Sequence, residues 1–244
     1  MIGHAPTPPS PRWLGRARRD PLWRLLFALG LLSAFAVAMV LFRAAWTGRV
    51  TYRFLYWNLF LAWVPVGAAL LAHGLAAARR PPWLVALPLL AWLAFFPNAP
   101  YILTDLMHLR TTGGAPLWLD VLQVGTVALA GLLTGLGSLR LAHGVVTRLT
   151  RASLAGWLFA GLSCLGAGFG VYLGRFERWN SWDIVTRPGD VLVNALESLT
   201  VDRALAFSLL FGALLFLVYL VLTALGGAPT PHGDGLAAPA PPTE

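Results

Sequence analysis

Six apolar segments alternate with short polar ones along this chain of 244 residues. A helix needs roughly 20 apolar residues to cross about 30 Å of hydrocarbon. Five of the segments reach that length, and the third is shorter. The pattern predicts an all-α, polytopic membrane protein with about six transmembrane helices, a broken third helix and short interfacial helices. The predicted spans cover residues 22–42, 54–77, 83–96, 117–139, 154–173 and 204–225.

Composition supports the membrane assignment. Hydrophobic residues make up 57% of the chain and charged residues 11%, whereas soluble domains carry about 25% charged residues. The net charge of +8 comes from arginines spread between the apolar spans, as orientation signals are. We therefore expect a lipid bilayer as partner and no nucleic acid. The single cysteine, Cys164, lies within a span and is expected to pack as a small hydrophobe.

The chain divides into one membrane domain and two polar ends. Residues 1–20 are basic and Pro-rich, residues 21–226 hold the spans, and residues 227–244 are rich in Ala and Pro. Both ends are expected to be disordered. Residues 36–38 resemble a signal-peptide cleavage site, but the apolar stretch is long for a signal peptide, which favours an uncleaved first helix.

Two polar, aromatic blocks interrupt the apolar pattern. The first block is residues 96–109 (FPNAPYILTDLMHL), and the second block is residues 174–185 (GRFERWNSWDIV). An even number of crossings separates them, so both are expected on one membrane face. Ten arginines lie in segments on the N-terminal side and eight on the other side, with five near the first helix, which usually dominates orientation. This count predicts cytoplasmic termini in the cytoplasmic (inner) membrane and places both blocks outside.

The first block predicts a break in the third span. Neither Pro97 nor Pro100 has an N–H to continue a helix. Asn98 is a good N-cap residue, so a short helix is expected to restart near Ala99 and to end near Leu109. Such a helix would lie in the interface or fold back onto the bundle.

On that short helix, polar residues fall in one stripe at three- and four-residue spacing. Tyr101, Asp105 and His108 share the stripe with Thr104. A carboxylate and an imidazole on one face suit a ligand site or a general base with its orienting partner. The alternatives are a local hydrogen-bonded pair of Asp105 with His108, or a metal site, for which two candidate ligands are too few.

The second block combines arginines with tryptophans at the end of the fifth span. A helical continuation would place Arg175, Arg178, Trp179 and Trp182 on one face to hold an anionic or sugar-like group, with Glu177 or Asp183 as acid or base. Alternatively, the tryptophans form an interfacial belt beside ion pairs of Arg175 or Arg178 with Asp105 or Asp183.

The residues after this arginine and tryptophan cluster predict short elements. Asn180 or Ser181 could cap a new helix, and residues 188–190 are typical of a turn. Residues 191–199 then form an amphipathic piece, with leucines on one side.

Polar residues inside spans are functional candidates because they are costly in a bilayer. Asp120, Gln123 and Asn58 approach the same face as the two blocks. Asp120 follows Pro116 closely, so headgroup water is an alternative surrounding for it. His73 and His143 approach the opposite face and are interpreted as helix-end residues.

Glycines recur at four-residue spacing in two spans. They are Gly131 and Gly135 in the fourth span, and Gly166, Gly170 and Gly174 in the fifth. Small residues at this spacing let helix backbones approach closely, so the pattern favours packing between helices of this chain over dimerisation.

The two blocks resemble the signature of an uncharacterised membrane family, the domain-of-unknown-function 1361 family. The resemblance runs from the second span to the sixth and implies a multi-helix membrane protein without a known activity. The positions that carry it are Pro97, Asn98, Pro100, Tyr101, Asp105, Arg178, Trp179, Asn180, Trp182 and Asp183.

The sequence thus predicts a polar site that binds or transports a small polar or anionic molecule on the outer face. A membrane enzyme acting on a lipid-linked substrate and a structural or assembly protein are the alternatives. No cofactor and no metal are predicted. The candidate ligand-binding residues are Asn98, Tyr101, Asp105, His108, Asp120, Arg175, Arg178, Trp179, Asn180, Trp182 and Asp183.

Overall fold

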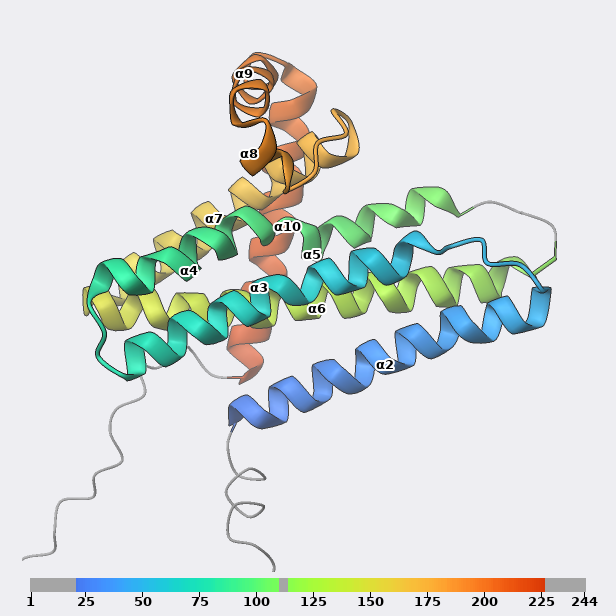
Figure 1. The fold of residues 1–244 in the computed structure, drawn as a ribbon, viewed down its shortest axis with the longest axis horizontal. Coiled ribbons are helices and arrows are strands. Elements are labelled where there is room, and N and C mark those ends of the chain that lie inside the picture. Colours follow the sequence, from blue (N-terminus) through green and yellow to red (C-terminus); the bar gives the residue numbers. More distant parts are fainter. Residues whose placement is uncertain (1–20, 110–113, 227–244) are drawn as a thin grey trace, which may run out of the picture.

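The computed structural model describes residues 21–109 and 114–226. Within these residues the protein is a helical bundle without strands, and six of its helical segments are long and apolar enough to cross a membrane (Figure 1). The predicted fold class is confirmed, whereas the two ends expected to be disordered lie outside the described residues. The six segments are α2 (Pro21–Thr47), α3 (Phe54–Ala77), the broken span Pro82–His108, α6 (Leu117–Thr150), α7 (Ser153–Arg175) and α10 (Asp202–Gly226).

Helix α6 is the central element of the bundle, and it contacts α2, α3, α7 and the broken span. It continues eleven residues past the predicted end at 139, to Thr150, where Arg151 adopts a left-handed conformation (φ 56°). The predicted end at residue 139 marks where the apolar sequence stops, which is where the helix leaves the hydrocarbon. The helix itself continues beyond that point because its backbone hydrogen bonds continue. His143 therefore lies inside α6 rather than at a helix end. It is buried, with Nδ1 2.8 Å from the Tyr219 hydroxyl.

The third span is broken, as predicted, into α4 (Pro82–Phe95), α5 (Asn98–Tyr101) and the 3-10 helix η1 (Ile102–His108). The predicted N-cap role of Asn98 is wrong, because Asn98 lies inside α5. At the break the Ala99 N–H donates to Phe96 O. Asn98 Nδ2 supplies a donor to Phe95 O at 2.9 Å. The side chain thus replaces a backbone donor where the helix changes direction.

Glycines set how closely the broken span approaches α6 and α7. A Cβ on Gly131 would lie 2.6 Å from Ile102 Cδ1, and one on Gly170 would lie 2.7 Å from Pro97 Cγ. Gly135 and Gly174 are in similar close approach to the same segment, so the predicted packing within the chain is found at these positions. The prediction is wrong for Gly166, which meets nothing within 4 Å.

A different pair of glycines closes the contact between α7 and α10. A Cβ on Gly168 would lie 2.4 Å from Ser208 O, and one on Gly212 would lie 2.8 Å from Leu165 Cα. The four-residue pattern along α7 does not reveal this contact, because it depends on which face of α7 meets α10.

The second block is not a helical continuation of α7. The helix ends at Arg175, and Arg178 has a left-handed backbone (φ 63°), so the prediction of one shared helical face from Arg175 to Trp182 is wrong. Two short helices follow, α8 (Asp183–Thr186) and α9 (Pro188–Ser198). Pro188 occupies the first turn of α9, where its missing N–H costs nothing, so the predicted turn at 188–190 is a helix start instead. Both helices lie together at the top of Figure 1.

Candidate functional site

A pocket of about 230 Å³ lies where the two blocks meet. Its walls come from α3, from the end of α4 with α5, from the end of α7, and from residues 179–191. The polar residues that line it are Asn58, Asn98, Tyr101, Trp179, Asn180 and Ser181. Apolar lining residues include Trp57, Leu61, Leu93, Ile184 and Val191. The pocket is therefore amphipathic, and its polar side is made of neutral groups.

Arg175 joins the two blocks beside this pocket. Its guanidinium donates to the Asp105 carboxylate at 2.5 Å and, through Nε, to the Thr104 hydroxyl at 2.8 Å. The same group lies 4.4 Å from the centre of the Tyr101 ring. The side chains of Arg175 and Asp105 are only 10% and 2% exposed. Of the ion pairs weighed from the sequence, this pair is found, and it is buried rather than at a wet rim.

Asp105 also reaches the second span. It accepts a hydrogen bond of 2.8 Å from Asn58 Nδ2, so one carboxylate ties together α3, η1 and α7. The expected local pair of Asp105 with His108 is replaced by contacts of both residues with Arg175, whose Nη1 lies 3.4 Å from His108 Nε2. The His108 ring packs edge-on against Phe54 and lies outside the pocket lining.

Direct hydrogen bonds also connect the first block with the second block. Asn98 Nδ2 donates to Ser181 Oγ at 2.8 Å. Trp182 packs edge-on against Phe95, with ring centres 5.2 Å apart, and does not line the pocket. Trp179 does line it, and its Nε1 donates to Asn194 of α9 at 2.8 Å. The predicted meeting of the two blocks is therefore found, with a different division of roles.

Asp183 shapes the loop that carries Trp179 and Asn180. One of its oxygens accepts the Asn180 N–H at 2.8 Å and the other accepts Arg187 at 2.9 Å. The hydrogen bond from Arg187, followed by the bond from the Asn180 backbone, lowers the pKa of Asp183. Asp183 is thus held ionised and does not line the pocket.

Arg187, rather than Arg178, stacks on the tryptophan of the second block. Its guanidinium lies 4.9 Å from the centre of the Trp179 ring. Arg178 is exposed and makes no hydrogen bond or ion pair with the part of the chain that the structure describes. The predicted role of Arg178 in the polar cluster therefore belongs to Arg187.

The side-chain nitrogens of two pocket amides, Asn58 and Asn98, already donate within the protein. A carboxylate and a backbone carbonyl only accept, so Asn58 must present Nδ2 to Asp105, and Asn98 must present Nδ2 to Phe95 O. The Oδ1 atoms of both amides receive no hydrogen bond from the described residues. The Tyr101 hydroxyl likewise has no partner among them. The pocket therefore offers the acceptors of Asn58 and Asn98, together with the Asn180 amide and hydroxyls that can act in either direction.

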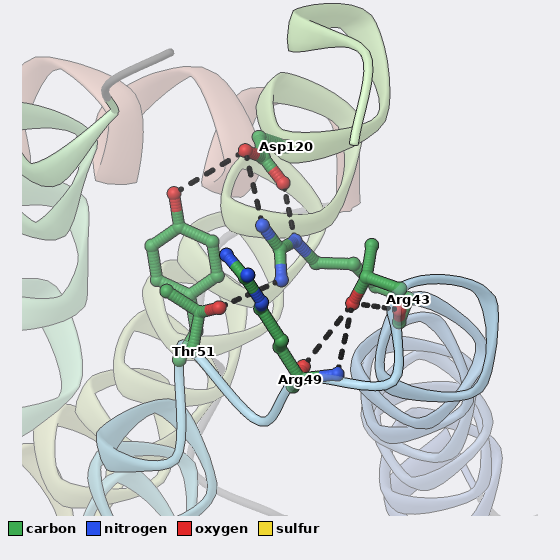
Figure 2. A network of polar contacts seen from close by, with 6 residues as sticks. Arg43, Arg49, Thr51 and Asp120 are labelled. Carbon is green, nitrogen blue, oxygen red and sulfur yellow. Dashed lines mark hydrogen bonds and ion pairs between the residues drawn. The ribbon is translucent and has the colours of Figure 1, made fainter. Parts of the chain in front are cut away.

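Asp120 belongs to a separate network nearer the α2–α3 connection (Figure 2). Its carboxylate pairs with Arg43 of α2, which also donates to Thr51 Oγ1 at 3.0 Å. The Tyr52 hydroxyl lies 3.5 Å from the same carboxylate. The side chains of Arg43 and Asp120 are 3% and 1% exposed, so of the two surroundings considered for Asp120, headgroup water is not the one found. Asp120 fastens α2 to α6 and is not part of the pocket.

Within residues 21–109 and 114–226, no group of three or more His, Cys, Asp or Glu side chains is placed to hold a metal ion. The acids and bases beside the pocket act as partners of one another. The residues that line the pocket can bind a ligand through amide groups, hydroxyls and aromatic rings.

Sequence reasoning misses several residues of the site. Asn58 stands out as a polar residue in an apolar span, and that rarity is a usable signal, although it does not by itself assign Asn58 to the site. Thr104 belongs to the polar stripe of the first block, and Arg187 follows Asp183 at four-residue spacing, so both carry a local signal. Ser181 and Arg43 give no comparable signal, because their roles depend on which distant segment each one meets.

Together, the fold and the site define an integral membrane protein whose described residues include six segments long and apolar enough to cross a membrane, with a pocket where the two blocks meet. The model of the family described as "Protein of unknown function (DUF1361)" matches residues 57–218, and the chain belongs to this family. The match covers both blocks, as the resemblance in the sequence implies. No curated protein and no solved structure matches the chain.

Proposed function

We propose that this protein binds a small, uncharged, hydroxyl-bearing molecule in the pocket between the two blocks. The observation that carries the proposal is the set of unused acceptors, Asn58 Oδ1 and Asn98 Oδ1, beside the Tyr101 hydroxyl. A ligand that brings O–H donors can hydrogen-bond to them, and each neutral hydrogen bond contributes about 0.5–1.5 kcal/mol. The exposed ring of Trp57 suits the C–H side of a sugar ring or polyol.

The charges beside the pocket argue for a neutral ligand. Among the described lining residues there is neither an acid nor a base. An anion would find few free donors, because Arg175 and Arg187 are engaged with Asp105 and Asp183. A cation would approach the Tyr101 and Trp179 rings, where these two guanidinium groups already lie. The proposal thus keeps the polar ligand predicted from the sequence and sets aside the anionic one.

The wall of the pocket favours binding or transport over catalysis. The break of the third span at Pro97 contributes to that wall, and broken helices line the binding sites of many transporters. The enzyme alternative needs an acid or base that can reach the ligand. Asp105 and Asp183, its best candidates, instead serve as acceptors for arginines and backbone or amide donors.

The pocket is proposed to open on the extracytoplasmic face of the cytoplasmic membrane. Support comes from the arginine count, in which the N-terminal side of the first helix is the more basic. The pocket residues lie at the opposite ends of their spans from that side, near the start of α3 and the ends of α4 and α7.

The proposal is tested by filling the pocket. Ala94 lines it, whereas Ala91, one turn earlier on α4, is exposed and does not. We expect methyl β-glucoside to raise the unfolding temperature of the purified wild-type protein and of Ala91→Phe, but not that of Ala94→Phe. Glucose 6-phosphate and choline should have little effect on any of them.

A milder variant isolates the hydrogen bond. Tyr101→Phe removes one hydroxyl from the pocket, and Tyr56→Phe removes one from a partly buried tyrosine of α3 that does not line it. A neutral hydrogen bond contributes about 0.5–1.5 kcal/mol, so Tyr101→Phe should weaken the binding of methyl β-glucoside about two- to tenfold and Tyr56→Phe should not. Equal binding by wild type and Ala94→Phe would refute the proposed site.

A further inference from the structure

We propose that the ligand is the headgroup of a neutral, hydroxylated membrane lipid, such as a glycosyl diacylglycerol, which enters the pocket from the bilayer. This inference rests on the proposed function and names the class of ligand for the same site. Its evidence lies at the mouth of the pocket, whereas the proposed function is carried by the polar interior.

The residues at the mouth are mostly apolar, and one amide, Asn180, lies among them. A residue that lines the pocket and is also exposed lies at its opening, and three large side chains meet both conditions. Trp57 of α3 is 54% exposed, Leu93 of α4 is 41% exposed, and Ile184 of α8 is 45% exposed. A pocket that takes its ligand from water is expected to have a polar rim. Here Asn180 is the polar exception, and the three large apolar side chains form a side of the rim that suits a hydrocarbon chain.

The position of the mouth along the helices places it at the bilayer boundary. Trp57 lies one turn into α3, which starts at Phe54, and Leu93 lies near the end of α4 at Phe95. At 1.5 Å per residue, Trp57 is within about 5 Å of the start of its span, and Leu93 is within about 5 Å of the break in the third span. The polar lining of the pocket would then be at headgroup depth, with the apolar mouth beside the first carbons of the chains.

The surface around the mouth is apolar as well. On α3, Phe60 is 56% exposed and stacks on Trp57 with ring centres 5.3 Å apart. On the other side, Val185 of α8 and Leu192 of α9 are 79% and 59% exposed. Helix α9 has apolar and polar faces of the kind that lie in a membrane interface. An acyl chain leaving the pocket would therefore meet apolar surface in either direction.

Headgroup chemistry follows from the pocket interior. The unused Oδ1 atoms of Asn58 and Asn98 call for hydroxyl donors, and no charged side chain among the described residues lines the cavity. A phosphate headgroup would bring acceptors to acceptors. A glycosyl or similar polyol headgroup brings hydroxyls, and the ester-linked chains that follow it can pass Leu93 and Trp57.

The test uses the full-length protein in phosphatidylcholine nanodiscs that contain a minor fraction of monoglucosyl diacylglycerol, diacylglycerol or phosphatidylglycerol. Native mass spectrometry after release counts the lipid that stays bound. We expect retention of monoglucosyl diacylglycerol about tenfold above either comparison lipid, equivalent to about 1.4 kcal/mol. Leu93→Trp, which narrows the mouth, should abolish the difference. Leu90→Trp is the matched control, because Leu90 is 61% exposed on the same helix and does not line the pocket.

The outcomes separate the two proposals. Equal retention of all three lipids, or equal behaviour of Leu93→Trp and Leu90→Trp, overturns the lipid inference. If methyl β-glucoside still stabilises the wild-type protein and not Ala94→Phe in that case, the ligand is a water-borne polyol and the proposed function stands. If neither the glucoside nor the glucolipid distinguishes wild type from Ala94→Phe, the proposed function fails and the lipid inference fails with it.

Discussion

The guanidinium of Arg175 donates to the carboxylate of Asp105 across 70 positions of sequence, and both side chains are almost fully buried. Through Asp105 the contact continues to Asn58, which donates its Nδ2 to that carboxylate and also lines the pocket. One ion pair therefore fixes the relative positions of α3, η1 and α7, and with them the shape of the pocket.

Removing one partner of this pair should destabilise the protein strongly. Asp105→Ala leaves the Arg175 charge in a site that is only 10% exposed, and breaking a buried pair in this way costs about 3–5 kcal/mol. Arg175→Ala should have a similar effect, and the double variant should lose less than the sum of the two. Unfolding in detergent, followed by circular dichroism, measures these changes.

The control for that experiment is Arg178→Ala. Arg178 is exposed, so its removal should change the free energy of unfolding by no more than about 0.5 kcal/mol. Similar losses for Arg178→Ala and Asp105→Ala would show that the buried pair has no special role.

The ion pair of Arg43 with Asp120 should stabilise the packing of α2 against α6 and should not take part in ligand binding. Asp120→Asn leaves Arg43 charged at 3% exposure, so the unfolding midpoint should fall sharply. Replacing both residues with apolar side chains, as in Arg43→Met with Asp120→Leu, should recover most of the loss while leaving glucoside binding unchanged. Loss of binding in the double variant would instead connect this network to the pocket. Glu197→Gln, on the exposed surface of α9, serves as the neutral comparison.

Two glycines of α7 only two positions apart should respond in opposite directions to the same substitution. Gly168→Ala places a methyl group 2.4 Å from Ser208 O and should cost about 1–3 kcal/mol by separating α7 from α10. Gly166→Ala meets nothing within 4 Å and should stabilise the helix by up to about 1 kcal/mol. The measurement is the thermal unfolding temperature of each variant relative to wild type. Equal shifts for the two variants would argue against the close crossing of α7 and α10 at Gly168.

The ion pair of Asp183 with Arg187 should make stability depend on pH in the acidic range. The hydrogen bond from Arg187 lowers the pKa of Asp183, so the folded state holds the ionised form more strongly than the unfolded state does. Its stabilising contribution is therefore fully present above the unfolded pKa and is lost as the pH falls through the folded value. The difference in unfolding temperature between wild type and Asp183→Asn should be largest near pH 7 and shrink toward pH 3. A constant difference across this range would contradict the assignment.

Cysteine labelling tests the proposed orientation. Asp190→Cys places a thiol at an exposed position of α9, and Arg80→Cys places one in the exposed turn between α3 and α4. A membrane-impermeant maleimide added to intact cells should label Asp190→Cys and leave Arg80→Cys unlabelled. The wild-type Cys164 is fully buried, so the unmodified protein gives the background signal. The reverse labelling pattern would place the pocket on the cytoplasmic side.

Several features of the site follow from local sequence rules. The break at Pro97 is predicted because proline has no backbone N–H to continue a helix, and the structure has the break at that point. The close approach at Gly131 and Gly135 likewise follows from residue size and helical spacing. Sequence rules place Asn98 correctly at the break but with the wrong contact, because its amide serves Phe95 and Ser181 instead of capping α5.

The errors arise where the local path of the backbone or a long-range contact, rather than helical spacing, decides the partner of a side chain. Arg178 and Arg187 both lie near the tryptophans in sequence, yet the left-handed backbone at Arg178 turns the chain so that Arg187 stacks on Trp179 and pairs with Asp183. Similarly, the sequence could not tell that Asp120 would meet Arg43 of α2 instead of headgroup water.

The sequence by itself determined the six apolar spans, the broken third span and the presence of both blocks on one face, because hydrophobic length, proline chemistry and the parity of crossings are properties of the chain read in order. Only the tertiary structure decided which donors and acceptors are used up inside the protein. Asp105 could have paired with His108 within its own helix, and it bonds to Arg175 and Asn58 instead. That choice depends on how three spans pack, and it leaves amide oxygens, rather than charges, facing the pocket.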